Sequence, residues 1–137
     1  YKDVHMRSPE TYCYFISLAF HLAKIEDAVV TYIVPNNMLF QNENEKTRNL
    51  LMFKHQLVRA ITLGDNTFEN ADVPTCIFVA TSKEHTNYDV KYSDYRNYNI
   101  KKIDWNKDLE SISVNLINTL PSNVIGMSNS DIKFLIQ

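Results

Sequence analysis

The chain has 137 residues, of which 45% are apolar and 22% charged, as in a globular domain and unlike a disordered chain. Its net charge of −2 gives no basic excess of the kind that marks many nucleic-acid-binding domains. Glycine is scarce, because the chain has only 2, Gly64 and Gly126, where average usage predicts about ten. A P-loop or a dinucleotide fingerprint needs several glycines close together, so the sequence excludes a phosphate or cofactor site on a glycine-rich loop.

Neither a membrane span nor a metal site is expected. No apolar run approaches the roughly 18 residues of a membrane helix, and residues 1–5 lack the apolar core of a signal peptide. We therefore expect a cytoplasmic protein without a membrane partner, and a chain starting without Met is expected to be a piece of a longer one. Cys13 and Cys76 lie in apolar runs without metal-ligand spacing, which indicates buried, reduced thiols. The histidines have no helical metal-ligand spacing either.

The first elements in chain order are a helix and a strand. Residues 8–10, Ser-Pro-Glu, are typical of a helix start, and apolar residues at helical spacing extend this helix over residues 9–24. A β-branched run without polar alternation follows at residues 28–34, which predicts a strand covered on both faces. Pro35 ends that strand, and a loop begins just beyond it.

A second helix fits residues 43–57, and a short strand at 58–63 follows it. Residues 64–75 form a long loop that carries an aromatic residue among polar ones, before another buried strand at 76–80. A loop of this length between two strands is usually functional or disordered, and its composition favours a functional one.

The character of the chain changes in its last third. Residues 84–99 hold tyrosines among Asn, Asp and Lys, which predicts an extended, irregular connector. The tyrosine cluster either stacks on nucleic-acid bases or packs onto a neighbouring layer, and packing is favoured. Likewise, the basic residues are interpreted as a solvated face rather than phosphate contacts; they are Lys91, Arg96, Lys101 and Lys102. Helices are predicted over residues 107–119 and from the capping segment at 128–131 to the chain end.

This order of elements predicts an α/β fold. It is that of the second half of an open α/β sheet whose last two strands are antiparallel. Ligands of such sheets bind beyond the carboxyl ends of the strands. We therefore expect residues 35–37 and the loop at 64–75 to lie at the functional edge of the sheet.

Three strings carry a more specific signal. Residues 31–40, TYIVPNNMLF, resemble the fifth strand and following turn of N6-adenine-specific DNA methyltransferases, as found in type I modification subunits and in Taq- and Eco57-like type II enzymes. Residues 64–79, which include FENADVPTC, resemble the element between the sixth and seventh strands of that family. Residues 12–19 resemble the start of the helix before the fifth strand. All three strings occur in the family's order and spacing.

The resemblance implies the C-terminal half of a Rossmann-like, S-adenosylmethionine-dependent methyltransferase sheet with flanking helices and an antiparallel last strand. In the family, an aromatic residue between the sixth and seventh strands stacks on the adenine that is flipped out of the duplex. By resemblance this residue is Phe68, whose alternative interpretation is a loop phenylalanine folded into the core. Pro35, Asn36 and Thr75 are candidates for the edge of the pocket, although turn and strand propensities explain Asn36 and Thr75 equally well.

Two family motifs are missing from this chain. The glycine-rich S-adenosylmethionine loop and the Asn/Asp-Pro-Pro-Tyr/Phe motif that holds the target amine both lie further N-terminal in the family. We therefore expect no catalytic and no cofactor-binding residue here. The resemblance implies that residues 1–83 are the second half of a catalytic domain and that residues 84–137 are a connector with helices leading toward a target-recognition domain.

The function implied by this resemblance is that of a fragment. The parent protein would be a site-specific, adenine-N6 DNA methyltransferase of a bacterial restriction-modification system, acting on double-stranded DNA with S-adenosylmethionine, and the isolated chain would be inactive. Its partners would be DNA and the remainder of the methyltransferase domain. The last third of the chain favours an Eco57-like parent over a type I subunit. Two alternatives stay open: a degenerate, non-catalytic module for protein or DNA interaction, and a generic α/β domain.

Overall fold

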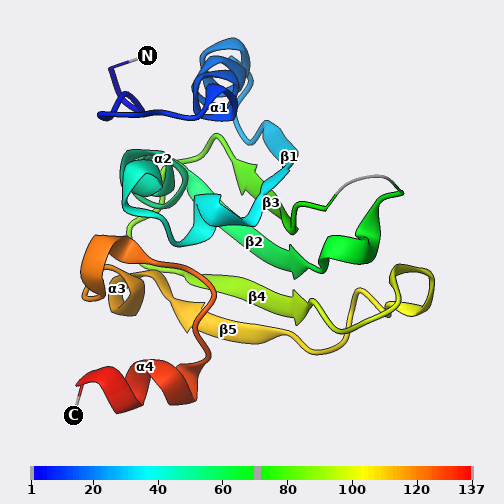
Figure 1. The fold of residues 1–137 in the computed structure, drawn as a ribbon. Helices are drawn as coiled ribbons and strands as arrows, with labels where there is room; N and C mark the ends of the chain where they lie inside the picture. Colours follow the sequence, from blue (N-terminus) through cyan, green and yellow to red (C-terminus); the bar gives the residue numbers. More distant parts are fainter. Residues whose placement is uncertain (1, 70–71, 137) are drawn as a thin grey trace.

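Five strands form one sheet in the order β1-β3-β2-β4-β5 in the computed structural model, which describes residues 2–69 and 72–136 (Figure 1). Strand β3 runs antiparallel to both of its neighbours, β1 and β2. In contrast, β4 is parallel to β2, and β5 is antiparallel to β4. As a result, β1, β2 and β4 all end at the same edge of the sheet. The strands are β1 Val29–Pro35, β2 Gln56–Leu63, β3 Thr75–Thr81, β4 Asp89–Tyr95 and β5 Glu110–Ser113.

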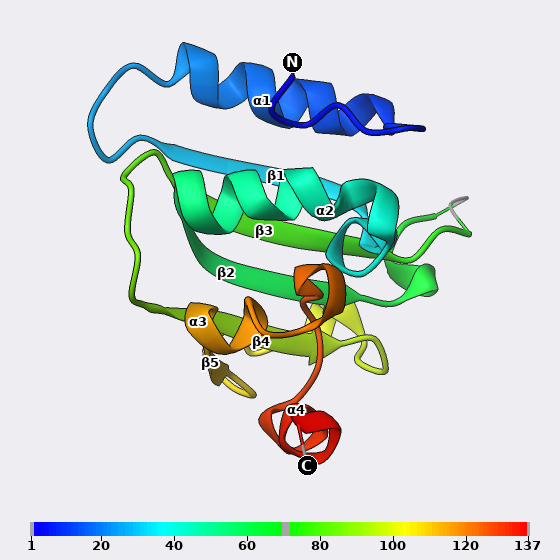
Figure 2. The same ribbon diagram turned by 90° about the vertical axis from the view of Figure 1, so that its left-hand side faces the viewer.

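Helices α1, α2 and α3 cover one face of this sheet (Figure 2). The buried side chains of β3 on this face are Cys76, Phe78 and Ala80, each with 0% of its surface exposed. The predicted α/β fold with flanking helices and an antiparallel last strand is thus confirmed. The helices are α1 Thr11–Leu22, α2 Glu45–Asn49 with its π-helical continuation Leu50–Lys54, α3 Val114–Ile117 and α4 Asn129–Ile136.

The opposite face of the sheet is covered only in part. Ile61, Leu63 and Tyr95 form a small second cluster there, and Ile77 and Ile103 pack against it. Toward the β1 edge this face is open, because Val29 and Ile33 keep 64% and 53% of their surface exposed. The prediction that the strand at residues 28–34 is covered on both faces is therefore wrong, since helices cover only one face of it. The outer side of β1 pairs with no other strand in the described part of the chain.

Three predicted elements are wrong in type or extent. The predicted connector at residues 84–99 contains strand β4, because Val90 and Tyr92 alternate with exposed residues and bury against the helix layer. The predicted helix at 107–119 is mostly absent, since its centre forms β5 by pairing with β4, and only α3 is helical. The helix predicted at 43–57 ends at Lys54, and β2 begins at Gln56.

Short 3-10 turns connect these elements at the edge where β1, β2 and β4 end. They include Asn36–Leu39 directly after β1, Asp65–Thr67 after β2 and Ile100–Lys102 after β4. None of the helices in residues 2–69 and 72–136 is long and apolar enough to cross a membrane.

Candidate functional site

The structure brings Pro35, Asn36 and Thr75 together. Pro35, the last residue of β1, is paired with Thr75, the first residue of β3. Beyond this pair, the backbone amide of Asn36 donates to the carbonyl oxygen of Pro74 at 3.0 Å. These contacts join the turn after β1 to the end of the loop that carries Phe68. The expected pocket-edge residues therefore lie side by side at the sheet edge that the strand pattern predicts.

Phe68 follows the Asp65–Thr67 turn in an extended backbone conformation. Its side chain is 41% exposed, so it is not folded into the core. The hydroxyl of Thr67 donates to the carbonyl oxygen of Gly64 at 2.7 Å and closes the turn before it. Asn70 and Ala71, which belong to the string resembling the methyltransferases, lie outside the described residues.

Thr75 and Cys76 are both shielded from solvent where the loop enters β3. The hydroxyl oxygen of Thr75 is buried and has no hydrogen-bond partner among the described residues. Burial raises the pKa of the Cys76 thiol to about 12, and both Cys13 and Cys76 are free thiols inside the fold. The prediction of buried, reduced cysteines is confirmed, and neither thiol is poised as a nucleophile.

A hydrogen-bonded network holds the turn after β1. The hydroxyl of Tyr12 on α1 donates to the side-chain oxygen of Asn37 at 2.9 Å. Asn44 is fully buried, and its amide donates to the Tyr12 hydroxyl at 3.0 Å and to the Asn37 carbonyl oxygen at 3.4 Å. The Cys13 thiol donates to the side-chain oxygen of Asn44 at 3.3 Å. This network fixes Asn37 and leaves the neighbouring Asn36 at the sheet edge.

Arg48 on α2 fixes the same segment from beneath. It has 0% of its surface exposed, and its Nη1 donates to the carbonyl oxygens of Met38 and Gln41, both at 2.8 Å. Burial lowers the pKa of Arg48 to about 10, which leaves the guanidinium charged at neutral pH. The guanidinium thus supplies hydrogen-bond donors to carbonyl oxygens of a tight turn that are not paired within a helix or a sheet.

Sequence reasoning did not single out Arg48, Asn44 or the Tyr12 hydroxyl. Arg48 lies in a predicted helix, where arginine is ordinarily exposed, so nothing in the pattern marks it as buried. The one usable signal is its position in the sequence. Thr47, Leu50 and Leu51 predict the inward face of the helix, and Arg48 lies between Thr47 and Leu50.

Asn36 also lines a small cavity, of about 60 Å³, between the turn after β1 and strand β4. Thr62 and Tyr92 close its floor with a hydrogen bond of 3.0 Å between their hydroxyls. On its rim, Arg96 is held by Asp94, with its Nη2 at 2.6 Å from Oδ2; the hydrogen bond lowers the pKa of the Asp94 carboxyl. No group of three or more His, Cys, Asp or Glu side chains in the described ranges could hold a metal ion.

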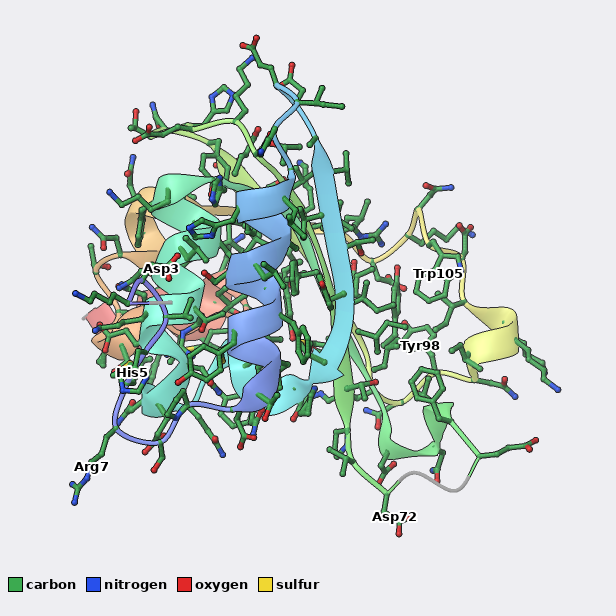
Figure 3. The ribbon with its side chains drawn as sticks, turned by 90° about the horizontal axis from the view of Figure 1, so that it is seen from above. Asp3, His5, Arg7, Asp72, Tyr98 and Trp105 are labelled. Atoms are coloured by element: carbon green, nitrogen blue, oxygen red, sulfur yellow. The ribbon has the colours of Figure 1, made fainter. Side chains whose placement is uncertain are left out.

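The tyrosines of the last third of the chain divide into two groups. Tyr92 and Tyr95 are buried, and the Tyr88 hydroxyl donates to the Met52 carbonyl oxygen at 2.8 Å. These rings pack between layers, as the favoured interpretation predicted. Tyr98 differs, because 51% of its surface is exposed. In Figure 3 it lies with Trp105 on the side of the sheet away from α1.

Comparison with known proteins identifies proteins that are similar to this chain. Residues 1–68 match the sequence model of the Eco57I restriction-modification methylase family. No curated protein matches the chain. The family match disfavours both alternatives, the non-catalytic module and the generic α/β domain.

Several solved structures share the fold. A modification subunit of a type I restriction enzyme from Vibrio vulnificus YJ016 has a TM-score of 0.65 at 17% identity, over 92% of this chain and 31% of that one. The type I methyltransferase subunit from Streptococcus thermophilus has a TM-score of 0.55 at 22% identity, over 99% of this chain and 25% of that one. The EcoKI M protein has a TM-score of 0.52 at 23% identity, over 64% of this chain and 20% of that one.

The solved relatives are much longer than this chain. It spans less than a third of the length of each of these three solved relatives. The family match covers helix α1, strands β1 and β2 and the turns that follow these two strands, and it ends before β3. Over residues 1–68, this chain is therefore similar to the Eco57I restriction-modification methylase family.

Proposed function

We propose that this chain is the half of an adenine-N6 DNA methyltransferase domain that completes the pocket for the flipped base. The observation that carries the proposal is the position of Phe68, which is 41% exposed at the edge where β1 and β2 end. The loop that bears it resembles the base-stacking loop of the family. The substrate would be double-stranded DNA, and the product N6-methyladenine at a specific site.

The energetics of base flipping give Phe68 its role. Removing adenine from the duplex costs a few kcal/mol in lost pairing and stacking. An aromatic ring that stacks on the extruded base returns about 1–3 kcal/mol. Phe68 supplies this ring, and Pro35, Asn36 and Thr75 form the adjoining wall, where the unpartnered Thr75 hydroxyl is a polar group that a base edge can bind.

Cofactor and catalytic motif would come from outside these residues. Gly64 and Gly126 lie far apart in sequence, so no glycine-rich loop is formed here and the residues present do not fit an S-adenosylmethionine site. The remainder of the methyltransferase domain would cover the open β1 edge and the outer side of α1, where Phe15 and Leu22 expose 55% and 68% of their surface. The isolated chain would then be inactive.

The proposal is tested in the full-length protein. Transfer of labelled methyl from S-adenosylmethionine to plasmid DNA is measured for the wild type, Phe68→Ala and Phe68→Trp, with Phe134→Ala as an exposed control on α4. We expect Phe68→Ala to lower kcat/KM by about tenfold or more, since a stacking ring contributes about 1–3 kcal/mol, and Phe68→Trp to retain most of it. Unchanged kinetics in Phe68→Ala would refute the role of Phe68, and a wild type that methylates no adenine would refute the function.

A further inference from the structure

A second cavity lies beside the proposed base pocket and is not used by it. It has a volume of about 500 Å³ and lies between the turn after β2 and the turn after β4, residues 64–67 and 96–100. Because β2 and β4 are parallel neighbours, both turns leave the sheet at the edge that carries Phe68. This cavity is called the inter-turn cavity below.

The two walls of the inter-turn cavity are held in contact at its base. A Cβ built on Gly64 would clash with the backbone carbonyl of Arg96, so only glycine permits this approach. One of the two glycines in the chain is thus placed at the seam between the two turns. The seam therefore depends on close backbone packing and is not a gap between independent loops.

Apart from Ile100, the lining side chains are polar or aromatic. Asn66 and Asn97 are exposed amides, one on each wall. Tyr98 is 51% exposed, but its position is fixed: its ring packs edge-on against Tyr95 with centroids 5.4 Å apart, and its hydroxyl donates to Oδ2 of Asp108 at 3.0 Å. A pre-positioned, solvent-facing aromatic ring is a stacking platform.

Arg96 lines the cavity on the β4 side, and two lysines directly follow the last lining residue, Ile100, in sequence. Lys101 and Lys102 are exposed on the short turn that follows Tyr98. Arg96 is 57% exposed, and its ion pair with Asp94 uses Nε and Nη2, which leaves Nη1 without a partner among the described residues. Asp65 is the one carboxylate among the residues that line the cavity, while Asp94 is paired with Arg96 and Asp108 accepts from Tyr98.

We propose that the inter-turn cavity binds a nucleotide of the DNA strand next to the flipped adenine, with its phosphate on Lys101 and Lys102 and its sugar or base against Tyr98. This inference rests on the proposed function. Flipping a base leaves its neighbours partly unstacked and distorts the backbone beside them. A surface that combines an aromatic ring, amides and cations matches all three parts of such a nucleotide, whereas an apolar peptide finds no groove here.

Binding measurements with the full-length protein test the inference. The probe is a short, fluorescently labelled duplex that contains the site the protein methylates in a plasmid, titrated at several salt concentrations. Tyr98→Ala is expected to raise Kd by about tenfold, in line with about 1–3 kcal/mol for a stacked base. Tyr98→Phe keeps the ring and loses only the bond to Asp108, so its Kd is expected to stay near the wild-type value.

The lysines are tested together. Lys101→Gln/Lys102→Gln is expected to weaken binding and to reduce the slope of log K against log salt by roughly 0.9 for each phosphate that the protein no longer neutralises. The matched control is Lys24→Gln/Lys83→Gln, two exposed lysines at the opposite edge of the sheet, which should leave the slope unchanged. Circular dichroism spectra check that each variant folds. If Tyr98→Ala does not fold, the variant of the two surface lysines still tests the inference.

The outcomes separate this inference from the proposed function. If Phe68→Ala impairs methylation while the Tyr98 and lysine variants bind DNA like the wild type, the inter-turn cavity is not a nucleotide site and the base pocket stands. If these variants weaken binding of S-adenosylmethionine and not of DNA, the inference is wrong about the ligand. A wild type that neither binds nor methylates DNA would refute the proposed function itself.

Discussion

The guanidinium of Arg48 donates two hydrogen bonds to the carbonyl oxygen of Ser122, from Nε at 3.2 Å and from Nη2 at 2.7 Å. Ser122 has φ of 53° and ψ of 21°, a left-handed conformation that a serine rarely adopts. The same guanidinium reaches Met38 and Gln41 in the turn after β1. One buried side chain thus joins the β1 turn, helix α2 and the segment after α3, which lie far apart in sequence.

We expect Arg48→Met to destabilise the fold by about 3 kcal/mol or more, because it leaves several buried carbonyl oxygens without a donor and each costs about 1–3 kcal/mol. Urea denaturation followed by circular dichroism measures the free energy of unfolding. The control is Arg7→Met, since Arg7 is exposed near the N-terminus. A loss below about 1 kcal/mol in Arg48→Met would mean that water or rearrangement replaces the guanidinium.

Substitution of Gly64 tests whether the two turns are packed as closely as the structure shows. Any Cβ at Gly64 would have to displace the backbone of Arg96, so Gly64→Ala is expected to cost about 1–3 kcal/mol, as overpacking does in cores. Asp65→Ala, an exposed neighbour in the same turn, should change the free energy of unfolding by less than about 0.5 kcal/mol. Equal stability of the two variants would contradict the close approach of the two turns.

How far the sequence predicts this fold depends on the residue types in each strand. β1 and β3 are predictable because both are uninterrupted β-branched or apolar runs next to a proline, a pattern that a helix rarely shows. β4 contains Lys91, Ser93 and Asp94, which mask the alternation of Val90 and Tyr92. β5 shows no strand pattern, because it has only 4 residues and buries only Ile112.

The candidate site likewise has residues that the sequence predicts and residues that it does not. The sequence predicts the place of Phe68, Pro35, Asn36 and Thr75, because their strings resemble a family and strand ends determine the functional edge. It does not predict that Tyr98 is exposed while Tyr92 and Tyr95 are buried. Tyr92 and Tyr95 lie in β4, whereas Tyr98 lies beyond its end, and β4 is the strand that the polar composition of this segment hides.

Alkaline pH is expected to destabilise the chain through its buried acids. Burial raises the folded-state pKa of Cys76 from 9.0 to about 12 and that of Tyr88 from 10.0 to about 12. A raised pKa means that the folded state retains the proton, so this contribution is fully present below pH 9 and is lost as pH rises toward 12. The free energy of unfolding should therefore fall by several kcal/mol over this range. Urea denaturation at a series of pH values measures it, and Cys76→Ala should reduce the slope.

The open edge of β1 predicts self-association of residues 1–137 when they are produced alone. An unpaired strand edge next to exposed apolar side chains is a template for pairing with a second chain, and Ile33 and Val29 are exposed beside this edge at 53% and 64%. We expect concentration-dependent oligomers in light scattering, together with binding of a hydrophobic dye. Ile33→Lys places a charge on the open face and should reduce both signals, whereas Thr86→Lys, an exposed position after β3, should not. If the wild-type segment stays monomeric and binds no dye at high concentration, the β1 edge is protected and needs no partner.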